Sequence, residues 1–238
     1  MKPNQSLSSS KKNQIKKMFD SISRKYDLLN RIITFGNDIK WRKKMFSIAK
    51  ENNPKKILDI ATGTADVALE LSKIEDSEIT GIDISSKMLS LGRKKIETRQ
   101  LSLQISLECE DAENLPYPKN SFDLVTISFG VRNFQDLENG LKESNRVLKK
   151  NGVLIILETS IPKNYLINFI YMLFIRLYIP FISSIFSNNV SAYSYLQKSA
   201  EKFPSGEKFV SVLKRCGFKK INTYPQMLGA TSIYTANK

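Results

Sequence analysis

The sequence contains no histidine and only two cysteines, Cys109 and Cys216, among its 238 residues. The absence of histidine excludes Ser-His-Asp triads, Cys-His dyads, histidine-ligated zinc or haem, and imidazole as a general acid or base. The two cysteines lie far apart and give neither a metal-ligand spacing nor a disulfide framework, which is the pattern of a reducing compartment. We therefore expect no metal site and a cytoplasmic location.

Acidic residues are scarce near the N-terminus, so the positive charge is concentrated there. Over the whole chain 37 Lys and Arg oppose 23 Asp and Glu, a formal net charge of +14. Residues 1–56 hold 15 of the basic residues and 4 of the acidic ones. Residues 1–10 lack the apolar core of a secretory signal, and we expect a disordered tail. At 41% hydrophobic and 25% charged residues, the composition is that of an ordinary globular protein.

The spacing of apolar residues predicts two helices followed by an α/β domain. From Ile15 to Ile33 apolar residues recur every three or four positions, and a second helical pattern ends near Pro54. These basic amphipathic helices, residues 11–53, precede a domain over residues 54–238. Short apolar runs predict strands near residues 56–61, 78–84, 103–109, 122–129, 152–158, 220–224 and 232–235. Strands buried on both faces and separated by helices indicate a Rossmann-like, doubly wound, mostly parallel sheet.

A long apolar run interrupts this alternation. The twenty residues from Ile167 to Phe186 carry one charge, Arg176. A central Arg costs about 2.5–3.5 kcal/mol on insertion scales, and together with Pro180 it argues against a membrane-spanning helix. Within a helical insertion at about 163–200 we expect one of two arrangements. Either a pair of helices packs over the core, or an apolar cover also receives an apolar substrate or touches a bilayer surface.

The turn after the first strand is the place where an open α/β sheet binds its ligand. It reads Asp59-Ile-Ala-Thr-Gly-Thr-Ala-Asp66. A dinucleotide fingerprint would need glycine at Ala61, Gly63 and Asp66, and the Asp66 carboxylate would repel a pyrophosphate at the helix N-terminus. A nucleoside with an ammonium and a carboxylate fits better, because N–H groups around Gly63 and Thr64 can hold the carboxylate while acidic side chains meet the cation. S-adenosylmethionine is such a ligand.

Two further acidic residues follow the next strands. Asp83 ends the second strand, where a carboxylate can accept both ribose hydroxyls. Asp111 follows the third, where its side chain could take the adenine amino group while the Ala112 N–H meets a ring nitrogen. Taken singly, Gly63 could be a turn glycine, Asp83 a helix N-cap and Asp111 a solvated loop acid. Their order on three successive strands favours one binding site.

Several motifs carry a family resemblance. Asp59–Asp66, Gly81-Ile-Asp-Ile-Ser85 with Met88-Leu89, Asp111-Ala112 with Leu115-Pro116, and Phe122-Asp123 resemble the motifs of class I methyltransferases. Ser128-Phe-Gly-Val-Arg-Asn133, Leu157-Glu-Thr-Ser160 and Tyr193-x-Tyr-Leu196 with Phe203-Pro204 resemble more specifically the ubiquinone/menaquinone biosynthesis C-methyltransferase family, as do Tyr26-Asp27 and Trp41-Arg42. The resemblance covers nearly the whole chain after the first ten residues.

This resemblance implies a class I fold and methyl transfer from S-adenosylmethionine to a ring carbon of a prenylated quinol, with demethylmenaquinol to menaquinol as the leading reaction. By match, Thr64, Asp83, Asp111, Ala112 and Ser128 take the cofactor-contact positions, and Asp59 and Gly63 belong to the same candidate site. Family members often carry a histidine near the C-terminus where this chain has Tyr234, which puts a catalytic role for that position in doubt.

Such a reaction needs an activated carbon nucleophile. Ionising a neighbouring quinol hydroxyl pushes electron density onto the ring carbon, so its phenol-like pKa of roughly 10 must be lowered or met by a base. Arg132 stays protonated and is expected to stabilise the phenolate. Tyr193, Tyr195 or a water held by Asp66 are the candidate proton acceptors. The alternative for Arg132 is a surface ion pair after the fourth strand.

The basic N-terminus suggests a partner. A prenylated quinol resides in the bilayer, and a cationic amphipathic helix gains about 1 kcal/mol per basic residue near anionic lipid. We expect transient contact with an anionic membrane surface, attachment at its inner face, and no nucleic-acid partner, because no RNA- or DNA-binding module is recognisable. A homodimer stays open. Two other functions stay open: a methyltransferase-like binding protein without turnover, and a methyltransferase that acts on RNA or a small phenol.

Overall fold

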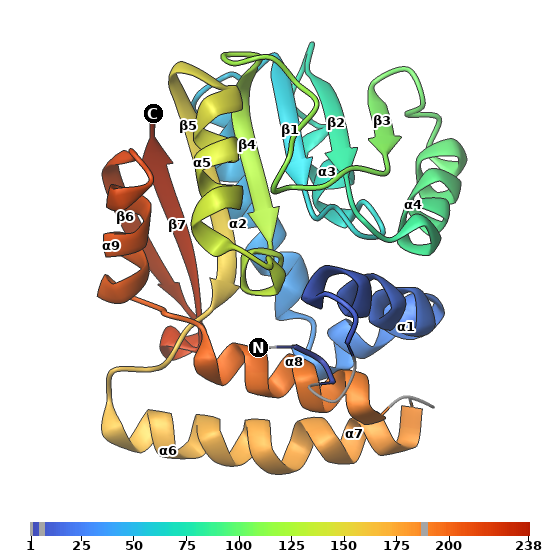
Figure 1. The fold of residues 1–238 in the computed structure, drawn as a ribbon, viewed down its shortest axis with the longest axis vertical. Helices are drawn as coiled ribbons and strands as arrows, with labels where there is room; N and C mark the ends of the chain where they lie inside the picture. Colours follow the sequence, from blue (N-terminus) through green and yellow to red (C-terminus); the bar gives the residue numbers. More distant parts are fainter. Residues whose placement is uncertain (1, 5–7, 187–189) are drawn as a thin grey trace.

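The computed structural model describes residues 2–4, 8–186 and 190–238, and its centre is a seven-stranded sheet (Figure 1). The strands are β1 (Lys56–Ile60), β2 (Glu78–Ile82), β3 (Ile105–Glu108), β4 (Phe122–Ser128), β5 (Leu148–Thr159), β6 (Lys219–Gln226) and β7 (Thr231–Asn237). Their order is β3-β2-β1-β4-β5-β7-β6. The first five are parallel, and β7 is antiparallel to both its neighbours. The expected doubly wound, mostly parallel α/β fold is confirmed.

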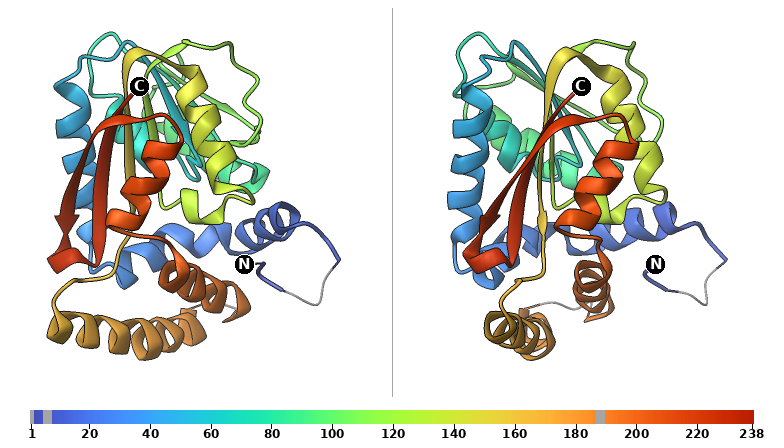
Figure 2. Two further views of the ribbon diagram at one scale, coloured as in Figure 1. Left: turned by 60° about the vertical axis from the view of Figure 1, so that its left-hand side comes forward. Right: turned by 90° about the vertical axis from the view of Figure 1, so that its left-hand side faces the viewer.

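Helices cover both faces of this sheet (Figure 2). They are α2 (Asn37–Lys50), α3 (Asp66–Leu71) and α4 (Ser86–Thr98) on one face and α5 (Leu137–Val147) and α9 (Glu207–Arg215) on the other. One apolar core joins Trp41 and Ile96 to Ile57 of β1. The second joins Leu141 and Phe209 to β4 and β5. Burial on both faces explains why β1, β4 and β5 read as continuous apolar runs.

Helix α1 (Lys11–Ile33) lies across the carboxyl ends of the strands, outside the two layers (Figure 1). The Ser10 hydroxyl caps its start by accepting from the Asn13 N–H. Its apolar face, with Ile15, Ile22 and Leu29, is buried in a third cluster that includes Tyr195 of α8 (Val190–Lys202). The periodic spacing therefore reflects packing inside the protein. The carboxyl edge of the sheet is roofed by a helix.

The segment between β5 and α9 forms one long helix followed by α8. It consists of α6 (Tyr165–Leu173), a π turn η2 (Phe174–Tyr178) and α7 (Ile179–Phe186). Proline has no N–H to donate in a regular helical turn, yet Pro180 does not end this helix. The π turn η2 lies directly before α7, which begins at Ile179. By length and composition, Tyr165–Ile182 could cross a membrane, and 11% of it is buried in the structure. Helices α7 and α8 pack on α1, below the sheet edge in Figure 1.

Candidate active site

Two adjoining cavities lie at the carboxyl ends of β1, β2 and β4, under helix α1. The first measures about 80 Å³ and the second about 210 Å³. Both are lined by Tyr26, Ala61, Gly63, Ser128 and Phe129. The predicted contact residue Ser128, the last residue of β4, thus stands between them. The site occupies the edge where parallel α/β sheets bind ligands.

Asp83 reaches the first cavity from the end of β2. Its carboxylate accepts the Gly63 N–H at 3.0 Å and the Ser85 N–H at 2.8 Å. The N-cap of α4 is Ser85, whose hydroxyl accepts from Met88 N, so the alternative that Asp83 is the cap does not hold. Burial raises the pKa of Asp83 to about 6. A carboxylate that lines a cavity with unused acceptor sites suits a ligand with hydroxyl groups.

Asp111 and Ala112 lie at the far end of the first cavity. Asp111 forms an ion pair with Lys12 of α1 and accepts the Glu113 N–H at 3.0 Å. It is therefore held in place on the cavity wall, with 31% of its side chain exposed. Lys12 also lines the cavity, so the first turn of α1 closes the site over the position that we assigned to the adenine.

The turn after β1 has an unusual backbone. Ala61, Gly63 and Ala65 have φ values of 56°, 56° and 65°, in the left-handed region that costs residues with a Cβ. Below it, the Asp59 carboxylate accepts the hydroxyls of Thr62 and Thr126 at 2.6 Å each. Asp59 is 1% exposed, and burial raises its pKa to about 6. Asp59 ties the turn to β4, whereas the Gly63 N–H, which we expected to hold the ligand's carboxylate, donates to Asp83.

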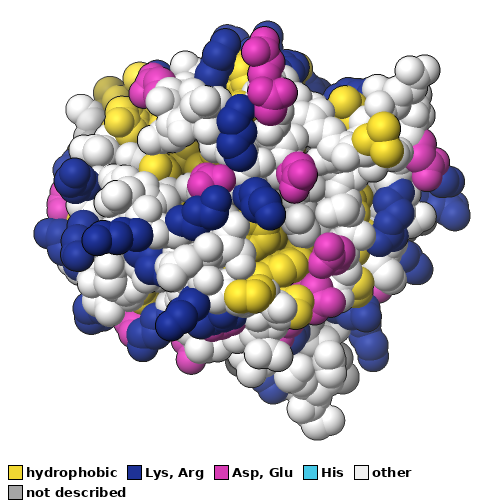
Figure 3. All heavy atoms as spheres, turned by 90° about the horizontal axis from the view of Figure 1, so that it is seen from above, with side chains coloured by type: hydrophobic (Ala, Val, Ile, Leu, Met, Phe, Trp, Pro, Cys, Tyr) yellow, Lys and Arg dark blue, Asp and Glu magenta, His cyan; other side chains and the backbone are white. Residues whose placement is uncertain are grey.

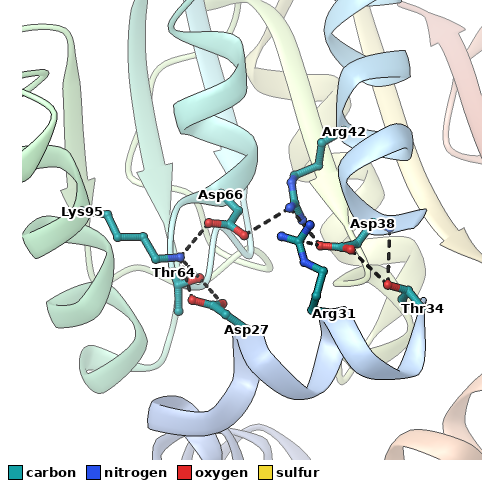
Figure 4. Close-up of polar contacts among 8 residues, drawn as sticks. All are labelled: Asp27, Arg31, Thr34, Asp38, Arg42, Thr64, Asp66 and Lys95. Atoms are coloured by element: carbon teal, nitrogen blue, oxygen red, sulfur yellow. Dashed lines mark hydrogen bonds and ion pairs between the residues drawn. The ribbon is translucent and has the colours of Figure 1, made fainter. Parts of the chain in front are cut away.

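Thr64 and Asp66 belong to an ion network that joins α1 and α2 to the turn (Figure 4). The Thr64 hydroxyl donates to Asp27 at 2.7 Å, and Lys95 lies 2.6 Å from Asp66 and 2.7 Å from Asp27. Arg42 bridges Asp66 and Asp38 at 3.4 and 2.9 Å. The sequence motifs did not predict Asp38, Arg42 or Lys95 as site residues. Only Tyr26-Asp27 and Trp41-Arg42 were indicated, through the family resemblance.

The second cavity is largely apolar. Trp41 and Phe129, whose rings are 5.9 Å apart, form one wall, and Tyr171, Phe174 and Ile175 of the long helix form another. Tyr171 was not among the predicted site residues. It lies in an apolar run with no motif, so its role depends on the fold. The aromatic walls give this cavity the character of a binding site for a ring.

Arg132 lines the second cavity and pairs with Glu158 of β5. The exposed fractions of the two side chains are 9% and 0%, so this is a buried ion pair and the alternative of a surface pair is wrong. The guanidinium also donates to the Phe129 carbonyl at 3.1 Å and lies 5.5 Å from the Phe129 ring centroid. Its Nε atom has no partner among the described residues. The positive charge of Arg132 is therefore fixed at the cavity, and its Nε–H is available to donate a further hydrogen bond.

Of the two tyrosines predicted as proton acceptors, the structure describes the side chain of one. The side chain of Tyr193 lies outside the described residues. Tyr195 is 2% exposed, and its hydroxyl has no partner within the described part of the chain. Burial raises the pKa of Tyr195, and that of Tyr171, to about 12, so neither phenol accepts a proton as a phenolate at neutral pH. Tyr234 is buried and accepts the Gly206 N–H at 2.8 Å, which is a structural role.

The sheet order and the acidic residues at three strand ends define a class I S-adenosylmethionine-dependent methyltransferase. More narrowly, the chain belongs to the ubiE/COQ5 methyltransferase family, whose model matches residues 7–238. The match includes the basic helices α1 and α2 as well as the sheet domain. The resemblance inferred from the motifs is confirmed.

Named relatives match nearly the whole chain. A demethylmenaquinone methyltransferase of Bacteroides fragilis is 38% identical over 229 residues, which are 96% of this chain and 94% of that protein. A ubiquinone/menaquinone biosynthesis C-methyltransferase of Geotalea daltonii is 40% identical, with 94% and 96% covered. A demethylmenaquinone methyltransferase of Thermotoga maritima is 42% identical, with 85% and 87% covered.

Solved structures share the fold at low identity. A possible histamine N-methyltransferase of Thermotoga maritima superposes with a TM-score of 0.64 at 20% identity, covering 93% of this chain and 99% of that one. The [4+2]-cyclase SpnF superposes with a TM-score of 0.63 at 16% identity, covering 95% and 96%. These likenesses concern the fold alone, since one neighbour is described as a cyclase.

Proposed function

We propose that this protein transfers a methyl group from S-adenosylmethionine to a ring carbon of a prenylated quinol, and that it converts demethylmenaquinol to menaquinol. The observation that carries this proposal is the junction of the two cavities: the smaller one, lined by Asp83 and Asp111 at the strand ends, adjoins a larger one with aromatic walls. The names of the relatives support the same reaction.

The residues of the first cavity fit the cofactor. Asp83 would accept the ribose hydroxyls, while Asp111 and the Ala112 N–H would contact the adenine. Tyr26 and Phe129, between the cavities, offer aromatic faces to a cationic sulfonium. The bound cofactor supplies an electrophilic methyl group. Asp59, Gly63, Thr64 and Ser128 shape this part of the site.

In the second cavity, the chain's own residues would orient and polarise the quinol. Arg132 places a fixed positive charge where a phenolate would develop, and such preorganised charge acts strongly in a site that excludes water. The aromatic walls and α1 exclude water, and holding the ring against the methyl group contributes several kcal/mol. Asp66 would hold the proton-accepting water, since it lines this cavity, where it also pairs with Arg42 and Lys95.

We also propose that the enzyme is cytoplasmic and attaches to the inner face of the membrane. Lys16, Lys17, Arg24 and Lys25 of α1 are exposed and available to anionic lipid. Most of the apolar face of α1 is buried, so α1 contributes mainly charge to such a contact.

The test is methyl transfer from labelled S-adenosylmethionine to reduced demethylmenaquinone, with the product analysed for a new carbon–methyl bond. A demethylated benzoquinol, a small phenol and transfer RNA serve as competing acceptors. Labelled menaquinol is the expected product. If calorimetry shows S-adenosylhomocysteine binding but no acceptor is methylated, the chain is a binding protein. Transfer to RNA or to the small phenol alone would replace the quinol as substrate.

A further inference from the structure

The long helix carries an exposed apolar row on the side away from the sheet. We call it the α6–α7 ridge, after the long helix that runs from α6 to α7, and its residues, which lie in α6 and η2, are Tyr165, Leu166, Phe169, Ile170, Leu173 and Leu177. Their exposed fractions range from 50% for Leu173 to 86% for Tyr165. None of the described residues of α6 is buried. Contiguous apolar surface of this kind marks an interaction site.

The spacing of the ridge keeps it on one side. Tyr165, Phe169, Leu173 and Leu177 follow at four-residue intervals, and such steps overshoot a turn of a 3.6-residue helix by about 40°. The π turn η2 begins at Phe174 and accommodates an extra residue per turn, which offsets this drift. The π turn thus keeps the apolar row on one continuous face of the helix.

The charges on the ridge's own stretch of the chain are of one sign. Residues 159–200 include no Asp or Glu, while Lys163, Arg176 and Lys198 are basic. Arg176, on the helix itself, lies 3.7 Å from Glu201 of α8. The opposite end of the molecule differs: Figure 3 shows acidic and basic side chains interspersed there, with hydrophobic ones in separate patches. An apolar row whose own segment carries only basic charges, one of them paired with Glu201, complements an anionic lipid surface.

The inner side of the same helix also favours a lipid surface as the partner. Tyr171, Phe174 and Ile175 line the second cavity, so one helix separates that cavity from the exterior. Because α7 packs on α1 and α8, the C-terminal part of the long helix belongs to the folded protein, which disfavours a membrane span. A helix with a free apolar side and a packed inner side lies in the interface plane.

We propose that the α6–α7 ridge inserts into the headgroup and acyl boundary of an anionic bilayer, with the long helix parallel to the membrane plane. The bilayer then lies directly outside the wall of the second cavity. Only the purpose of this insertion, which is access to a lipid-soluble quinol, rests on the proposed function. Lipid binding itself does not depend on turnover.

Flotation of the full chain with vesicles tests the insertion. The vesicles are phosphatidylcholine with and without phosphatidylglycerol, each at low and high salt. The double variant Phe169→Ser/Leu173→Ser removes two ridge side chains. The matched control is Leu103→Ser, since Leu103 is 104% exposed and precedes β3 at the opposite edge of the sheet. Partitioning should fall by at least about tenfold for the ridge variant, since burying one such side chain is worth at least that factor. The control should bind like the wild type.

Fluorescence locates the contact without depending on the loss of binding. Phe169→Trp should be quenched by vesicles with brominated acyl chains, and Leu103→Trp should not. The ridge residues do not line either cavity, so the Ser variants should turn over a short-tailed, water-soluble quinol at the wild-type rate. They should lose turnover with a long-tailed quinol in vesicles.

Three results would overturn the proposal. The ridge variants could bind vesicles as well as the wild type does. The wild type could fail to bind either vesicle. Light scattering could show a dimer that the ridge variant abolishes, with no quenching at Phe169→Trp, and a second copy of the chain would then cover the ridge. Failure of the wild type to methylate even the short-tailed quinol would instead refute the proposed function and leave the vesicle results valid.

Discussion

The buried pair of Arg132 and Glu158 allows the clearest separation of stability from catalysis. Glu158 is 0% exposed and also accepts the Thr159 N–H at 2.8 Å, while Arg132 donates to the Phe129 carbonyl as well. The perturbation is a cycle of Arg132→Met, Glu158→Leu and the double variant. Each single change leaves one buried charge without its partner. The double change leaves none and replaces both side chains by apolar ones of similar size.

The expected magnitudes follow from this burial. Removing one partner of a buried ion pair costs about 3–5 kcal/mol, whereas replacing both by apolar side chains is often neutral. The double variant should therefore be more stable than either single variant. Urea unfolding measures this, with Trp41 as the probe, because it is the single tryptophan and is 5% exposed. Turnover measured on the same samples should stay low in the double variant, because the positive charge at the cavity is gone.

Two results would refute this reasoning. If the costs of the two single changes simply add in the double variant, the charges are not coupled. If the double variant regains both stability and turnover, Arg132 serves only as the partner of Glu158 and has no role toward the quinol.

Two further predictions concern the buried acids. Asp83→Asn should raise the dissociation constant of S-adenosylhomocysteine by about tenfold or more, since charge-assisted hydrogen bonds are worth about 1.5–3 kcal/mol; calorimetry measures it, with Asp76→Asn, an exposed acid outside both cavities, as control. The second prediction is a pH dependence of stability. The folded pKa of Asp59, about 6, lies above the value of about 3.9 in an unfolded chain, so its contribution is present at acid pH and lost as the pH rises through 6. Relative to Asp59→Asn, the wild type should lose about 2 kcal/mol of unfolding free energy between pH 4 and 7, measured by urea titration at each pH.

An unchanged dissociation constant in Asp83→Asn would remove Asp83 from the ribose position. A difference between wild type and Asp59→Asn that is independent of pH would mean that Asp59 ionises normally in the folded chain.

Much of the site could be predicted from the sequence. Acidic residues follow successive predicted strands, and a parallel sheet brings the ends of those strands to one edge. Asp83, Asp111 and Ser128 therefore line one cavity as expected. Tyr195 shows the limit: the sequence made it a candidate proton acceptor, yet its burial, which raises its pKa, arises from packing against α1, a helix distant in the chain.

The sequence by itself determined the strands, the helices and their order, because apolar periodicity and turn residues act over a few neighbouring positions. Only the tertiary structure decided which charges meet. Lys12 pairs with Asp111 from 99 positions away, and Arg132 pairs with Glu158 across 26. It also decided that the apolar face of α1 is buried while that of α6 is exposed. Both faces have similar spacing, and which one becomes core depends on what the folded chain places against it.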